Sequence, residues 1–72
     1  SETIENYLKA IHTLAGESPS GEAGMKAVAT LVGVTVGTAS TMVKRMAAGR
    51  LVKYERFGGV KLTAKGRKIA VD

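Results

Sequence analysis

Cysteine and tryptophan are absent from this 72-residue chain, proline occurs once, and aromatic residues make up only 4% of it. Without cysteine, neither disulfide bonds nor thiolate metal sites can form. No apolar run approaches the roughly 18 residues that a membrane-spanning helix needs, and the acidic, polar start does not resemble a signal peptide. The hydrophobic fraction of 44% is that of an ordinary globular protein. We therefore expect a single small domain over 1–72, located in the cytoplasm and not in a membrane.

Positive charge is concentrated in the second half of the chain. Residues 1–43 hold two basic and four acidic residues, whereas residues 44–72 hold nine basic and two acidic ones. The net charge of +5 therefore comes from a strongly polarised distribution. A positive field of this kind attracts a polyanion such as nucleic acid. A solvated basic surface without a partner is the alternative interpretation.

Apolar spacing predicts three helices in the first two-thirds of the chain. The first covers 3–15 and is followed by Gly16 as a stop signal. A loop that holds the only proline is predicted over 17–24. The second helix covers about 26–32 and the third about 36–48. The residues expected to face the core are Ile4, Leu8, Ile11 and Leu14 in the first helix, Val28, Leu31 and Val32 in the second, and Val36, Ala39, Met42, Val43 and Met46 in the third.

Only three residues, 33–35, separate the second and third predicted helices. Gly33 can adopt the left-handed conformation that ends a helix, and Thr35 can cap the helix that follows. Two helices joined by a short turn that contains glycine are typical of a helix-turn-helix.

Two short β-prone runs follow, over 51–55 and 60–63, and the Gly-Gly pair between them favours a tight hairpin. Thr63 can cap a last helix over 64–71. The order of elements predicts a winged helix-turn-helix. This fold is mostly α, with a three-helix core, a two-stranded wing and the start of a C-terminal helix.

The face of the third helix opposite its apolar residues carries small and hydroxyl side chains near its start and cations near its end. Such small groups can approach base edges in a major groove, and the cations can bind phosphates. An ordinary solvated helix face is the alternative. In the wing we expect phosphate contacts from the two cations that flank the glycines, and we interpret Tyr54 and Phe57 as packing residues. The DNA-binding residues predicted in this way are Gly37, Thr38, Ser40, Thr41, Lys44, Arg45, Arg56 and Lys61.

No catalytic constellation is visible in the sequence. The chain has one histidine and six acidic residues, with no nucleophile–base pair and no phosphate-binding Gly-Lys-Ser/Thr motif. We therefore expect no enzymatic activity. A winged helix can also serve as a protein-interaction module that no longer binds DNA, and this is the alternative function.

Three stretches resemble the N-terminal domain of the diphtheria toxin repressor family, the iron- and manganese-dependent bacterial regulators. They are IENYLKAI (4–11), residues 34–46 and YERFGGVKLTAKG (54–66), whose Leu-Thr-x-x-Gly ending is distinctive. The resemblance implies a sequence-specific repressor that binds palindromic double-stranded DNA as a homodimer, with iron or manganese as a cofactor of the full-length protein. It also implies that Thr35, Gly37 and Thr41 lie nearest the bases. Since the last helix has no stop signal and the chain has no initiator methionine, we expect a fragment of a longer regulator.

Two metal-ligand positions of that family fall within the chain, and both are substituted. The position that is Met or Asp in well-known members is Asn6, and the position that is Glu in manganese-type members is Lys9. An amide oxygen is a weaker ligand than a carboxylate, and a lysine cation disfavours a metal ion nearby. The lone His12 is more often a surface or packing residue than a ligand. We therefore predict no metal ligand and no cofactor in this chain.

Overall fold

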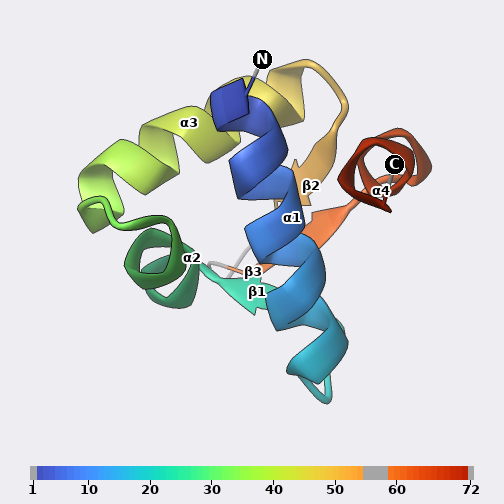
Figure 1. Cartoon of the computed structure of the whole chain (residues 1–72), viewed down its shortest axis with the longest axis horizontal. Coiled ribbons are helices and arrows are strands. Elements are labelled where there is room, and N and C mark those ends of the chain that lie inside the picture. The colour runs from blue at the N-terminus through green and yellow to red at the C-terminus, as the bar shows by residue number, and fades with distance from the viewer. Residues whose placement is uncertain (1, 55–58, 72) are drawn as a thin grey trace.

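The structure, a computed structural model, describes residues 2–54 and 59–71. Within them, four helices and three short strands follow one another along the chain (Figure 1). This order confirms the predicted winged helix-turn-helix architecture. The elements are α1 (Glu2–Glu17), β1 (Ala23–Gly24), α2 (Met25–Val32), α3 (Val36–Ala48), β2 (Val52–Tyr54), β3 (Gly59–Leu62) and α4 (Ala64–Val71).

Helix α1 is longer than its sequence pattern predicts. It ends at Glu17, so Gly16 lies inside the helix and the predicted stop is wrong. Glycine costs a helix only about 1 kcal/mol, which α1 tolerates in its last turn. No helix in 2–54 or 59–71 is by itself long and apolar enough to cross a membrane, and only α2 and α3 taken together across their bend reach that length.

A third strand, β1, completes a sheet that the sequence predicts as a hairpin only. Its two residues pair antiparallel with β3, with Ala23 opposite Val60 and Gly24 opposite Gly59. The strand order is β1-β3-β2. A two-residue strand is too short to show the alternation that identifies strands in a sequence. The prediction of a loop over 17–24 is therefore wrong at its C-terminal end.

Strands β2 and β3 form the predicted hairpin. Lys53 lies directly opposite Lys61, and Val52 lies opposite Leu62. Val52 and Val60 are buried, and successive side chains of a strand point to opposite faces of the sheet. Lys53 and Lys61 are consequently exposed on the solvent face.

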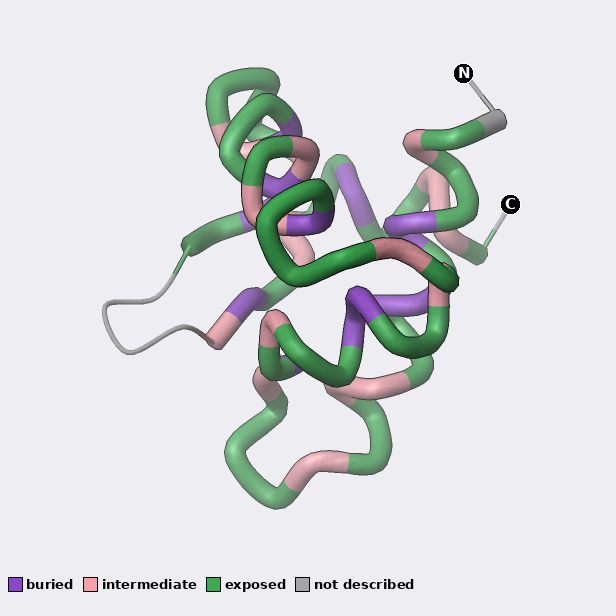
Figure 2. The backbone as a smooth tube through the Cα atoms, turned by 90° about the vertical axis from the view of Figure 1, so that its left-hand side faces the viewer, coloured by how far each residue is buried: buried purple, intermediate pink, exposed green. Residues whose placement is uncertain are grey.

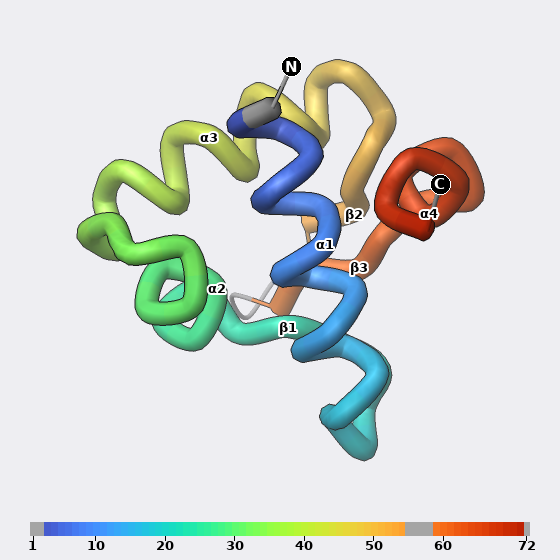
Figure 3. The backbone as a smooth tube through the Cα atoms, viewed as in Figure 1, coloured from blue at the N-terminus to red at the C-terminus, as the bar shows by residue number. Residues whose placement is uncertain are grey.

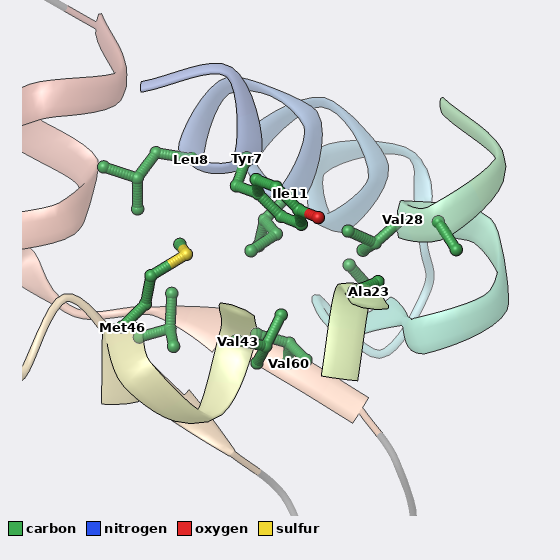
Figure 4. Packing of buried hydrophobic residues seen from close by; sticks show 11 residues of the cluster. Tyr7, Leu8, Ile11, Ala23, Val28, Val43, Met46 and Val60 are labelled. Atoms are coloured by element: carbon green, nitrogen blue, oxygen red, sulfur yellow. The ribbon is translucent and has the colours of Figure 1, made fainter. Parts of the chain in front are cut away.

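The hydrophobic core lies between α1 on one side and α3 and the sheet on the other (Figure 4). Helix α2 closes it with Val28 and Ala29. Among the described residues no polar or charged residue is buried. Because α3 and the sheet both turn their apolar faces toward α1, their solvent faces point away from α1. The largest buried side chains are Tyr7, Leu8, Ile11, Val28, Val43, Met46 and Val60.

Two apolar residues predicted to face the core are exposed instead. Leu31 of α2 is 54% exposed and Val36 of α3 is 48% exposed. Val36 falls on the apolar side of its helix but stands in the first turn, past the end of the core. Leu31 stands on the flank of α2, beside a shallow concavity that Leu14 and Ala27 also line. Helical periodicity gives the direction of a side chain, but it does not show where the core ends.

Helix α4 is fixed to the turn after α3 by Thr63. The Thr63 hydroxyl donates to the carbonyl oxygens of Arg50 and Leu51 at 2.6 and 3.0 Å. Its oxygen also accepts the Gly66 N–H at 3.1 Å, which confirms the predicted helix cap. A Cβ atom at position 66 would overlap the Leu51 carbonyl oxygen, so glycine is required there. This contact explains why threonine and glycine stand together in the Leu-Thr-x-x-Gly ending.

Candidate nucleic-acid interface

The turn between α2 and α3 sets the orientation of α3. Gly33 has a φ of +87°, and the amides of Gly33 and Val34 both donate to the Ala29 carbonyl, at 2.8 and 2.9 Å. Glycine adopts this left-handed conformation without a Cβ clash and so ends α2. The two helices meet at 104° (Figure 3), within the range of about 90–120° of helix-turn-helix pairs. The predicted turn over 33–35 is confirmed.

Thr35 caps α3 and is hydrogen bonded to Thr38. The Thr35 Oγ1 accepts the Thr38 N–H at 3.2 Å and donates its own proton to the Thr38 Oγ1 at 3.0 Å. Both side chains are exposed. Within the described part of the chain, no group accepts the hydroxyl proton of Thr38. Thr38 therefore presents a free donor at the start of α3.

Thr41 and Gly37 lie one turn apart on the exposed face of α3. The Thr41 hydroxyl donates to the Gly37 carbonyl oxygen at 3.0 Å, so its proton is used within the helix. What remains for a partner is an acceptor oxygen and a methyl group. A Cβ atom at Gly37 would meet nothing within 4 Å. The open space beside Thr41 is therefore not required by packing within the described protein, and it leaves room for a partner.

The remaining predicted residues of α3 differ in exposure. Lys44 and Arg45 are exposed in the second half of the helix. Ser40 is half-buried. The structure thus brings the cations and the threonines together on one face and places Ser40 at its edge. That these residues contact DNA stays a prediction.

The wing carries one predicted residue that the structure describes. Lys61 is exposed on β3, whereas Arg56 and Phe57 lie outside the described residues. Tyr54, interpreted from sequence as a packing residue, is 41% exposed at the end of β2. Figure 2 shows the described ends of β2 and β3 on the other side of the molecule from the start of α1 and the end of α4.

Lys53 is a candidate that sequence reasoning missed. It is exposed and stands directly opposite Lys61 in the sheet. In the sequence, Lys53 stands between apolar and aromatic residues. The sequence around it does not show which residue of the other strand lies opposite. Only the register of the hairpin reveals that two cations share this face.

The metal-ligand positions of the resembled family lie on α1, on the opposite side of the core from α3. Asn6 and Lys9 are exposed and, together with Thr13 and Leu31, line a concavity of about 370 Å³ that no carboxylate lines. His12 is also exposed. The described residues hold no group of three or more His, Cys, Asp or Glu that could bind a metal ion. By themselves they do not fit a metal centre.

A winged helix-turn-helix with a polar, cationic outer face on α3 defines a class of DNA-binding domains. Over residues 1–60 the sequence matches the family model of the iron dependent repressor, N-terminal DNA binding domain. The chain belongs to this family of metal-dependent transcriptional repressors. The resemblance inferred from the three sequence stretches is confirmed, and the family points to transcription control and not to catalysis.

Two curated relatives share one name. The chain is similar to Transcriptional regulator MntR of Escherichia coli O6:H1 (strain CFT073) and of Escherichia coli O157:H7. Each is 38% identical to it over 71 residues, which cover 99% of this chain. The chain spans 44% of the length of these relatives.

Proposed function

We propose that this chain is the sequence-specific DNA-binding domain of a transcriptional repressor, with α3 in the major groove and the wing against the phosphate backbone. The observation that carries the proposal is the exposed face of α3, where three threonines and a glycine stand at the start of a helix held at 104° to α2. In helix-turn-helix proteins the second helix enters the major groove with its N-terminal residues at the base edges.

The hydrogen bonds of the threonines give each a distinct role toward the bases. Thr41 offers an acceptor oxygen, which suits the amino group of adenine or cytosine, and a methyl group, which suits the methyl of thymine. Thr38 offers a free proton to a base acceptor or a phosphate oxygen. Gly37 allows the helix to approach closely. Thr35 orients Thr38 and lies nearest the groove at the helix start.

Cations at the edge of this face supply the contacts that do not depend on sequence. Lys44 and Arg45 follow the threonines along α3, and Lys61 lies on the wing. Arg56, outside the described residues, is proposed to act with Lys61. Phosphate contacts of this kind hold the protein in register on the duplex but do not read its sequence.

Properties of a longer protein form part of the same proposal. A repressor with two copies of this domain would bind a palindromic operator, because half-sites one helical turn apart match a two-fold symmetric dimer. Iron or manganese would act through ligands other than Asn6 and Lys9, since neither residue suits a divalent cation. Chromosomal DNA as the partner implies a cytoplasmic location.

Binding of a labelled mixed-sequence duplex at increasing salt tests the proposal. The 72-residue chain is expected to bind at about 50 mM salt, with an affinity that falls steeply as counterions compete. We expect weak binding, because a single domain occupies only one half-site. Non-specific DNA affinities reach dissociation constants of roughly 100 µM. No detectable binding at about that protein concentration would favour the protein-interaction alternative.

Substitutions at Thr41 test the reading role of α3. Thr41→Val keeps a branched side chain but removes the acceptor, and Thr41→Ser keeps the hydroxyl but removes the methyl. Each variant is expected to change which duplexes bind best, because each loses a different contact to the base edges. Arg56→Ala is expected to weaken all duplexes alike. Selection from a random duplex pool measures both, and an unchanged preference in both Thr41 variants would refute base reading by this residue.

A further inference from the structure

We propose that Lys53 and Lys61, which face each other across β2 and β3, form a phosphate-contact site on the solvent face of the sheet. This inference rests on the proposed DNA-binding function and adds Lys53 to the phosphate contact already proposed for Lys61. The ligand is the backbone of one DNA strand, with each lysine at its own phosphate.

The register of the hairpin places the two lysines next to each other. Lys53 and Lys61 are direct cross-strand partners, so their Cβ atoms stand about 5 Å apart. Two like charges directly opposite each other destabilise a sheet. Neither lysine forms an ion pair with any residue in the described ranges 2–54 and 59–71. Among the described residues nothing offsets the repulsion of this pair, and an anion between or beside the two ammonium groups would offset it.

The sheet lies next to α3 in the fold. Val60 of β3 and Val43 of α3 lie on the same side of the core, facing α1 (Figure 4). Thr41 of α3 and Lys61 of β3 stand on the faces turned away from this core, and both are exposed. Helix α3 also passes through a short turn into β2 and packs against it. A duplex whose bases meet α3 would bring its backbone over the two lysines.

Among the residues that the structure describes, one acidic residue lies beside these lysines. Extending the pairing of β1 with β3 by one residue places Glu22 beside Lys61. Its side chain instead covers Gly59, with Oε1 2.9 Å from where a Cβ of that glycine would stand. Glu22 therefore lies toward the end of β3 that adjoins residues 55–58, and among the described residues it forms no ion pair with either lysine.

Charge-removing variants of the two lysines test the proposal. Lys53→Gln and Lys61→Gln keep the length of the side chain, and Lys9→Gln on α1 is the matched control on the other side of the core. At 0.1 M salt each sheet variant is expected to bind a mixed-sequence duplex roughly five- to tenfold more weakly, with the log–log salt slope reduced by about 0.9. The double variant is expected to reduce the slope by about 1.8. Lys9→Gln is expected to leave the slope unchanged.

Thermal unfolding of the same variants separates a binding role from a structural one. Relief of the like-charge pair is expected to raise the Tm of Lys53→Gln and of Lys61→Gln by about 1–5 °C. A lower Tm together with weaker binding would mean that the lysines support the fold, and would overturn the proposal. A slope that changes no more in Lys53→Gln than in Lys9→Gln would overturn it as well.

The two proposals fail in different ways. If the unaltered chain binds duplex DNA and the Thr41 variants change its preference, but the lysine variants bind normally, only the sheet site is wrong. If the unaltered chain does not bind duplex DNA at all, both the proposed function and the sheet site are wrong.

Discussion

The side of the domain formed by α1 and the side formed by α3 and the sheet share one core but present different chemistry. On the α1 side, Asn6 and Lys9 stand beside a shallow concavity with no carboxylate in its lining. On the other side, threonines fixed by hydrogen bonds are followed by cations. The charge difference arises because the acidic first half of the chain supplies α1, whereas the basic second half supplies the end of α3 and strands β2 and β3.

In this small domain, the residues that stabilise the core and the residues proposed to bind DNA lie on different sides. Helix α1 contributes three of the largest buried side chains, and its exposed face carries no residue assigned to DNA. Helix α3 contributes Val43 and Met46 to the same core. The residues on its outer face are exposed and do not pack against the core. Matched substitutions on the two sides test whether stability and DNA binding are separated in this way.

The largest expected effect comes from placing the same methyl group on each side. Gly66→Ala drives a Cβ into the Leu51 carbonyl oxygen beneath the wing, and is expected to cost about 2 kcal/mol or more of unfolding free energy, because backbone cannot yield easily. Gly16→Ala in α1 meets nothing within 4 Å and is expected to gain about 0.5–1 kcal/mol. Chemical denaturation measures both, and a loss in Gly16→Ala would contradict the open environment of that residue.

A cap substitution separates folding from recognition within α3. Thr35→Ala is expected to cost about 1 kcal/mol, because the cap to the Thr38 amide is lost. Thr35→Asp keeps an equally good cap, so stability is expected to be retained, whereas duplex affinity is expected to fall about tenfold or more, because a carboxylate meets the DNA.

The control for that substitution stands on the α1 side. Thr13→Asp introduces the same charge at an exposed position and is expected to weaken duplex binding far less. Thermal unfolding and duplex titration give the two measurements. Equal losses of affinity in Thr13→Asp and Thr35→Asp would mean that net charge, and not position, governs binding.

The sequence predicts the helices best where their ends carry a chemical signal. The bounds of α3 agree with the prediction because Thr35 caps its start and Gly49 follows its end. Gly16 gives a false signal, since a glycine in the last turn costs too little to end a helix. Strand β1 is too short for any periodicity and forms only because β3 provides a partner edge.

Part of the candidate DNA-binding site can be predicted from the sequence, and part of it can be found only in the structure. The exposed face of α3 follows from helical rotation, which depends only on local geometry. The pairing of Lys53 with Lys61 depends on the register of two strands, and the packing of α3 against β2 depends on tertiary contacts. Neither can be read along a single stretch of chain. The hydrogen bonds that use the protons of Thr35 and Thr41 are likewise visible only in three dimensions.

The smallest expected effect has the opposite sign to the others. Glu22→Gln removes the acidic group from the solvent face of the sheet and is expected to strengthen duplex binding about twofold at low salt, because a carboxylate near the backbone repels it. Glu5→Gln makes the same change on the exposed face of α1 and is expected to leave affinity unchanged. Weaker binding by Glu22→Gln would mean that the sheet does not face DNA.

The hydrogen bonds of the α3 threonines have a consequence for the entropy of recognition. Threonine is stiff about χ1, and Thr35, Thr38 and Thr41 are each held by a bond before any partner arrives. Immobilising a flexible side chain on binding costs about 0.5–1.5 kcal/mol, and lysine or glutamine at these positions would incur it in full. Residues that are only middling helix formers thus give this helix a reading surface that is already ordered in the free protein.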